Sequence, residues 1–210
     1  PIPKKMADNM AVASPKRDGT ALFRLYYFGN LSEYGPMLAE ALKALSGHKD
    51  LRLEVRGANP KWPVDFREAM RSGGRWKDFA PRNELDSWLA EADMFLISMV
   101  CGAHSRRRME TSFPSKLIEF TQFGRPLVIW GPEYCSAVTW AQKGNHALCV
   151  TDANPDALCK ALEDLAANPA EQQRLAAAAR QASATDFNPD KIQAQFVSSL
   201  HQAVAAMPAG

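Results

Sequence analysis

Short apolar runs alternate with amphipathic stretches along most of the chain. The apolar runs are rich in leucine, β-branched and aromatic residues, and we interpret six of them as strands: 22–28, 51–55, 76–79, 94–97, 127–130 and 146–150. The stretches between them repeat apolar residues three and four positions apart, as helices do. This alternation predicts an α/β fold, a Rossmann-like parallel sheet of about six strands with helices on both faces. Such a sheet binds ligands at the carboxyl ends of its strands.

The stretch 111–130 carries the strongest local signals. Pro114 suits the first turn of a helix, because its fixed φ matches the helix and its missing N–H needs no partner. Gly124 can take the left-handed conformation that ends a helix, and Pro126 prevents continuation. We therefore expect a helix from near Pro114 to Gly124, followed by the strand over 127–130.

The start of this helix is a candidate phosphate site. The N–H groups of Ser115 and Lys116 have no intrahelical partner at the positive end of the helix dipole, and the Lys116 ammonium adds a full charge. Glu119 lies about one turn further in, where its carboxylate could accept two neighbouring hydroxyls, as a ribose offers. A nucleotide has both groups. The alternative is an ordinary helix with a solvated lysine and a surface glutamate.

Two further segments bear on the site. Asn83 is the expected cap of the helix that follows the third strand, and 99–112 reads as a long loop that contains Arg106, Arg107 and Arg108. Loops of this length are often functional. The three arginines could neutralise phosphate, although a short basic run is more often solvated surface.

Composition narrows the function classes. The chain has 210 residues, 46% hydrophobic and 23% charged, which suits a soluble globular domain over 21–205, with 1–20 as a linker or lead-in. A net charge of +2 does not favour a nucleic-acid partner. No run is long enough for a transmembrane segment, and no signal-peptide core is present, so we expect a cytoplasmic location. The four cysteines and four histidines are dispersed, and no metal site is expected.

Several stretches together resemble one family. Residues 114–120 read P-S-K-L-I-E-F and 124–128 read G-R-P-L-V, similar to the "P-S-K-L-x-E-Y…G-K-P-V-V" segment of the C-terminal, donor-binding domain of GT-B fold glycosyltransferases. The likeness is greatest to the large retaining family four. Strand-glycine matches at 28–29 and 55–57, and an "L-x-x-A-D-x-x-L" match at 89–96, support it.

The resemblance implies one half of a GT-B fold and a nucleotide-sugar donor, with a UDP-sugar favoured over a GDP-sugar. The residues that it and the strand-end argument place at the donor are Gly29, Asn30, Arg56, Phe79, Ser115, Lys116, Leu117 and Glu119. Backbone amides near Lys116 would bind the diphosphate, Phe79 would lie beside the base, and Glu119 would bind the ribose. No catalytic residue is assigned, and leaving-group charge would be stabilised without a metal, since no Asp-x-Asp motif is present.

A GT-B enzyme has two Rossmann-like domains, and this chain supplies one. We therefore expect a missing N-terminal acceptor domain as partner, no sugar transfer by this chain alone, and peripheral membrane contact as an option for the full enzyme. Two departures favour a non-catalytic interaction module instead. Thr111 stands where the family's E-x7-E motif has its first glutamate, with Glu110 one place off, and the basic pair after the first strand is missing, so that Lys116, Arg56 or the arginine run would have to replace it.

Two other classes fit less well. A nicotinamide or flavin Rossmann enzyme needs G-x-G-x-x-G after the first strand, which 29–35 does not supply. A nucleic-acid binder would rest on the single basic run at Arg106 to Arg108 in a near-neutral chain.

Overall fold

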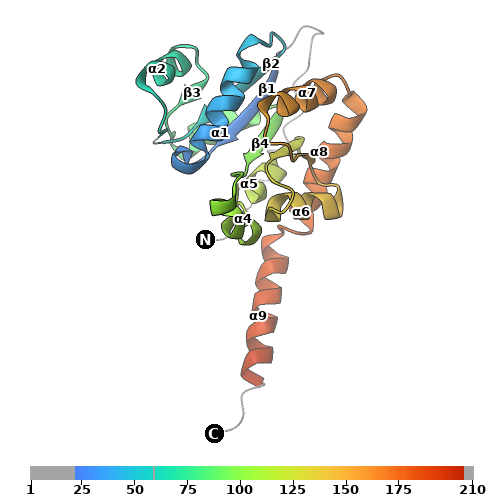
Figure 1. The fold of residues 1–210 in the computed structure, drawn as a ribbon. Helices are drawn as coiled ribbons and strands as arrows, with labels where there is room; N and C mark the ends of the chain where they lie inside the picture. Colours follow the sequence, from blue (N-terminus) through green and yellow to red (C-terminus); the bar gives the residue numbers. More distant parts are fainter. Residues whose placement is uncertain (1–21, 59, 206–210) are drawn as a thin grey trace.

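The computed structural model describes residues 22–58 and 60–205, so the predicted lead-in over 1–20 lies outside the described residues. Within them, six strands form one parallel sheet in the order β3-β2-β1-β4-β5-β6 (Figure 1). The strands are β1 (Phe23–Phe28), β2 (Leu51–Arg56), β3 (Trp76–Lys77), β4 (Met94–Ser98), β5 (Leu127–Trp130) and β6 (Leu148–Val150). The predicted α/β fold class is confirmed.

Helices cover both faces of the sheet. The helices are α1 (Leu31–Ala44), α2 (Val64–Ser72), α3 (Arg82–Ala90), α4 (Arg106–Thr111), α5 (Lys116–Gln122), α6 (Ser136–Gly144), α7 (Pro155–Ala166), α8 (Pro169–Ala184) and α9 (Pro189–Ala205), with 3-10 turns η2 (Leu45–Gly47) and η3 (Ala103–Ser105). Helices α1 and α7 contact each other on one face. Helices α3, α5 and α6 pack on the other.

The two faces form two separate cores because successive strand side chains point to opposite sides. In β1, Tyr27 joins the core under α1, whereas Tyr26 faces the other side and stacks on Trp88 of α3, with ring centroids 4.1 Å apart. In β4, Phe95 stacks on Phe120 of α5 at 4.3 Å. This stack packs α5 against β4, one of the two central strands of the sheet.

Two local expectations are wrong. The segment 99–112 is not a continuous loop, because it folds into η3 and α4; Met109 is buried there and Arg106 pairs with Glu110 one turn along, at 2.8 Å. Asn83 does not cap α3, because the helix begins one residue earlier, after Pro81, and Asn83 lies inside it. Pro81 has a fixed φ and leads the chain into the helix without a side-chain cap.

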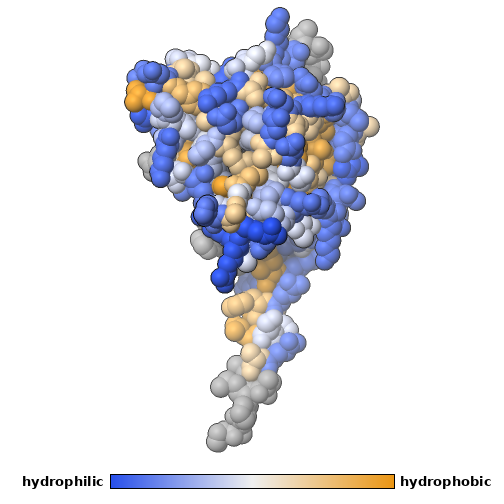
Figure 2. Space-filling model, in the orientation of Figure 1, coloured by the Kyte–Doolittle hydropathy of each residue, from blue (hydrophilic) through white to orange (hydrophobic). Residues whose placement is uncertain are grey.

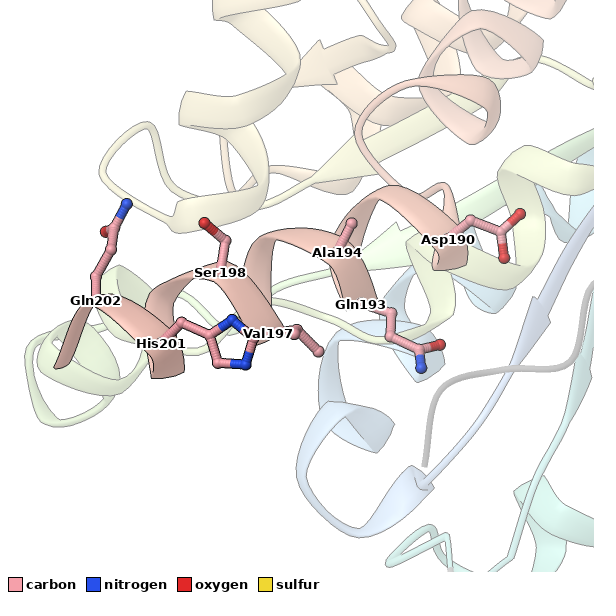
Figure 3. A pocket seen from close by; sticks show the side chains of 7 residues that line it. All are labelled: Asp190, Gln193, Ala194, Val197, Ser198, His201 and Gln202. Carbon is pink, nitrogen blue, oxygen red and sulfur yellow. The ribbon is translucent and has the colours of Figure 1, made fainter. Parts of the chain in front are cut away.

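The helix α9 extends away from the rest of the fold (Figure 1). Large apolar side chains on it are exposed: Ile192, Phe196, Val197 and Leu200. Figure 2 shows this apolar surface below a mostly hydrophilic body. A hollow on α9 is lined by that helix alone and therefore has one wall (Figure 3). No helix in the described residues is both long and apolar enough to cross a membrane.

Candidate functional site

The carboxyl ends of β1 and β2 meet in a backbone contact. The Gly29 N–H, directly after β1, donates to the Arg56 carbonyl at 2.9 Å. A Cβ atom on Gly57 would lie 2.0 Å from the Gly29 carbonyl oxygen, so only a glycine fits at position 57 without a shift of backbone. Gly29 itself has a φ of 150°, outside the range that other residues commonly adopt. The two glycines leave the strand ends without side chains of their own.

The Lys116 side chain occupies the space beside Gly29. A Cβ atom built on Gly29 would come within 2.0 Å of Lys116 Cε and 2.5 Å of its Nζ. The ammonium also lies 5.4 Å from the ring centroid of Tyr27 and 5.6 Å from that of Tyr34. Burial lowers the pKa of Lys116, and the nearby Glu119 charge opposes that shift. In the described part of the chain no carboxylate forms an ion pair with this ammonium, which makes it a ready partner for an anion.

The first turn of α5 has the backbone amides that the sequence places at the candidate phosphate site. The Leu117 N–H donates to the Pro114 carbonyl at 3.1 Å, and the Leu117 side chain is fully buried. Ser115 is the N-cap residue, and its side chain makes no capping bond. Among the described residues no backbone acceptor meets the N–H of Ser115 or Lys116. These two amides lie at the positive end of α5, on Lys116 itself and on the residue before it.

Glu119 is held by a residue that sequence reasoning missed. Its Oε1 accepts a hydrogen bond from Arg82 Nη1 at 2.5 Å. Arg82 is the first residue of α3, and its Nε also forms an ion pair with Asp86 at 2.9 Å. The hydrogen bond to Glu119 raises the pKa of Arg82. The sequence does show a basic residue, Arg82, close to the Phe79 loop that is predicted to contact the base. Its partner Glu119 on α5 is distant in the sequence, so the pair could not be predicted.

The remaining predicted residues divide between the strand ends and their surroundings. Phe79 follows β3, is half-exposed, and meets Phe28 edge-to-face at 5.6 Å. The Asn30 side chain caps α1 by accepting the Ser32 N–H at 2.9 Å. The Arg56 guanidinium lies over the Trp88 ring, 5.1 Å from its centroid, on the α3 face of β2. Phe79 therefore borders the strand ends, whereas the Arg56 side chain lies on the sheet face.

Two of the three consecutive arginines, both on helix α4, form ion pairs with glutamates. Arg108 forms an ion pair with Glu33 in the first turn of α1. Arg106 pairs with Glu110 and lies over the Tyr134 ring, 4.5 Å from its centroid. Thr111 ends the helix, and its hydroxyl donates to the Arg107 carbonyl at 2.9 Å. Glu110 and Thr111, which stand around the first E-x7-E position, are thus both engaged within α4.

The parallel sheet and its strand-end contacts define a Rossmann-like α/β domain. Residues 23–168 match the family model for group 1 glycosyl transferases, and the chain belongs to this family. This match confirms the predicted likeness to the C-terminal domain of a GT-B glycosyltransferase. No curated protein matches the chain significantly.

Solved structures share the fold at low sequence identity. HepE from Anabaena, in complex with UDP and glucose, has a TM-score of 0.66 and 15% identity over 86% of this chain and 48% of its own. Sucrose-phosphate synthase from Thermosynechococcus elongatus has a TM-score of 0.63 and 18% identity, covering 98% of this chain and 53% of its own. WaaG, a glycosyltransferase involved in lipopolysaccharide biosynthesis, has a TM-score of 0.54 and 20% identity over 80% and 44%. The chain thus spans about half the length of these proteins.

Proposed function

We propose that this chain is the donor-binding domain, over 21–205, of a retaining glycosyltransferase of family four. The enzyme would move a sugar from a nucleotide diphosphate sugar, with a UDP-sugar favoured over a GDP-sugar, to an acceptor. The observation that carries the proposal is the Lys116 ammonium, which lies against Gly29 at the end of β1 with no ion-pair partner in the described residues. HepE was solved with UDP-glucose, which supports the choice of donor.

In this proposal the diphosphate lies beside Lys116, over Gly29 and the amides of Ser115 and Lys116. Charge-assisted hydrogen bonds of this kind are the strong ones, and they suit a group of double negative charge. The ribose lies on Glu119, and the base lies near Phe79, the exposed aromatic ring at the strand ends. The donor thereby extends from the end of β1 and the first amides of α5, which bind the diphosphate, past Glu119 to the loop after β3.

The chain's part in the reaction is to bind the donor and to stabilise the leaving diphosphate. Lys116 and the neighbouring amides are placed to interact with charge that develops on the leaving group, which is where electrostatic stabilisation accelerates transfer. The acceptor and any further catalytic group belong to a missing N-terminal domain, so this chain alone is expected not to transfer sugar. The apolar face of α9 supports a covering partner, because isolated helices with exposed apolar residues are poorly stable in water. A cytoplasmic location and peripheral membrane contact of the whole enzyme complete the proposal.

Calorimetric titration of the chain with UDP, GDP and ADP, then with their sugar conjugates, tests donor binding. The proposal expects saturable binding with a preference for UDP. The variant Lys116→Met tests the role of the ammonium, because it keeps the length and apolar stem of the side chain and removes the charge. Absence of binding by the folded wild-type chain, or equal binding by the variant, would contradict the proposed diphosphate site.

A second candidate is a non-catalytic interaction module that keeps the fold and has lost donor binding. Specific observations favour it: the Thr111 hydroxyl is bonded to the Arg107 carbonyl, and Glu110 is paired with Arg106, so neither is free to take the role of the first glutamate. The same titration separates the two candidates. Nucleotide binding supports the donor domain, and its absence supports the module.

A further inference from the structure

The contact between Arg82 and Glu119 joins two helices that the proposed donor would touch. Arg82 begins α3, directly after the Phe79 loop, and Glu119 lies in the first turn of α5. The Nη1–Oε1 distance is 2.5 Å. The Glu119 side chain is only 19% exposed, whereas that of Arg82 is 54% exposed. The Glu119 side chain is therefore largely shielded from solvent, whereas the guanidinium that binds it is open to solvent.

The guanidinium is itself fixed in orientation. Its Nε lies 2.9 Å from Asp86 Oδ1, one turn along α3, while Nη1 reaches Glu119. A planar guanidinium with two anchored nitrogens has little freedom to rotate, in contrast to a lysine ammonium. A glutamate side chain otherwise has several rotamers that a ligand would have to select. Arg82 thus holds one carboxylate oxygen of Glu119 at a defined place.

The other carboxylate oxygen remains available. In the part of the chain that the structure describes, no hydrogen bond to Glu119 Oε2 is present, and Oε1 has a second lone pair beside the one that Arg82 uses. A carboxylate in this state can still accept two hydroxyl groups. The same segment that holds Glu119 also carries Phe79, so that one short stretch connects the proposed base and ribose positions.

The pair contributes little to folding by itself. Arg82 is half-exposed, and at such a side chain solvent screening and side-chain entropy offset much of the Coulomb attraction of an ion pair. A positional role explains the arrangement better than a stabilising one. We propose that Arg82 is a positioning residue that orients Glu119 for the ribose hydroxyls and connects ribose recognition to the Phe79 loop. This inference rests on the proposed donor-binding function.

The test compares the affinity of the whole chain for UDP and for 2′,3′-dideoxy-UDP, which lacks both ribose hydroxyls. The ratio of the two dissociation constants isolates ribose recognition. Arg82→Ala is expected to lower the UDP affinity by about 2- to 10-fold, the effect of one net hydrogen bond, and to leave dideoxy-UDP binding nearly unchanged. Arg82→Lys should give an intermediate ratio, because an ammonium cannot anchor both carboxylates. In a Glu119→Gln background, Arg82→Ala should have almost no further effect on the ratio.

The matched control is Arg174→Ala on α8. Arg174 is also half-exposed and binds a neighbouring carboxylate, that of Glu171, at 2.7 Å through two nitrogens. It should leave both affinities unchanged. If the wild-type chain binds UDP more tightly than dideoxy-UDP and the Arg82→Ala variant does so by the same ratio, the positioning role is overturned and the proposed function stands. A folded wild-type chain that binds neither nucleotide would overturn both.

Discussion

The Lys116 side chain lies against the bare backbone of Gly29, so that the amino end of α5 and the carboxyl end of β1 share one positive charge. A Cβ atom at Gly29 would meet Lys116 Cε at 2.0 Å and Nζ at 2.5 Å. Gly29 also has a φ of 150°. Glycine is therefore required here twice, once for the backbone conformation and once for the space that the lysine fills.

Gly29→Ala should weaken UDP binding by displacing the Lys116 ammonium. It should also lower the free energy of unfolding by about 1–3 kcal/mol, the cost of a non-glycine residue in such a conformation. Chemical denaturation and calorimetry measure the two effects. Gly47→Ala is the control, since a Cβ there meets nothing within 4 Å and should leave both quantities nearly unchanged. Unaltered UDP binding by Gly29→Ala would separate the glycine from the site.

Lys116→Met should both weaken UDP binding and remove a pH dependence of the free energy of unfolding. Burial lowers the pKa of Lys116 from 10.5, so between the folded and unfolded pKa values the unfolded chain binds more protons. The stability contributed by Lys116 therefore rises with pH through that window and is lowest below it. Burial also raises the pKa of Tyr27 and of Tyr34.

The unliganded Lys116→Met variant should accordingly be at least as stable as wild type at pH 7, with an advantage that shrinks toward pH 10. Its UDP affinity should fall by about 1.5–3 kcal/mol, the contribution of a hydrogen bond to a charged group. Denaturant titrations at the two pH values check the first statement. If the variant is less stable than wild type by the same amount at pH 7 and at pH 10, the ammonium stabilises the fold.

Glu119→Gln should weaken UDP binding by about 1.5–3 kcal/mol, because a neutral amide replaces the charged acceptor of the ribose hydroxyls. The affinity for 2′,3′-dideoxy-UDP should stay close to that of wild type. Glu171→Gln on α8, whose carboxylate is likewise bound by an arginine, is the control. An equal loss for both nucleotides would mean that Glu119 acts on the fold or on another part of the donor.

The double variant Phe196→Ser with Leu200→Ser should not change the free energy of unfolding by more than about 0.5 kcal/mol, since both side chains are exposed on α9. It should reduce any concentration-dependent association of the chain, because it removes much of the exposed apolar face. Leu175→Ala on α8 provides the contrast: that side chain is fully buried, and its truncation should cost about 2–5 kcal/mol. Denaturation and sedimentation measure the two effects. A large loss of stability in the double variant would contradict the exposed position of these residues.

The sheet could be predicted because its strands are short apolar runs between breaking residues. Leu127–Trp130, for example, is buried on both faces and follows a glycine that takes the expected left-handed φ, 57° at Gly124. The rule that ligands bind at the carboxyl ends of parallel strands placed Gly29 and Lys116 at one edge of the sheet, but the contact between them was not predicted. The strands and their parallel arrangement are thus predictable from the sequence, whereas their order in the sheet is known only from the structure.

The rest depends on contacts that spacing does not encode. Helix α4 is short and basic, and it becomes recognisable only once Met109 is seen to be buried. The Arg82–Glu119 bond joins residues on separate helices, and the packing of α3 and α5 on the sheet determines it. Asn83 lies inside α3 because the fixed φ of Pro81 starts the helix before it, an effect that capping propensity alone does not include.

The most direct test of the central claim is a UDP titration of the isotope-labelled chain followed by ¹H–¹⁵N spectroscopy. The account predicts saturable shifts of the Gly29, Ser115 and Lys116 amides, with those of α9 unchanged. A folded chain whose spectrum does not respond to UDP, or responds only away from these three amides, would contradict the assignment of a donor site between β1 and α5.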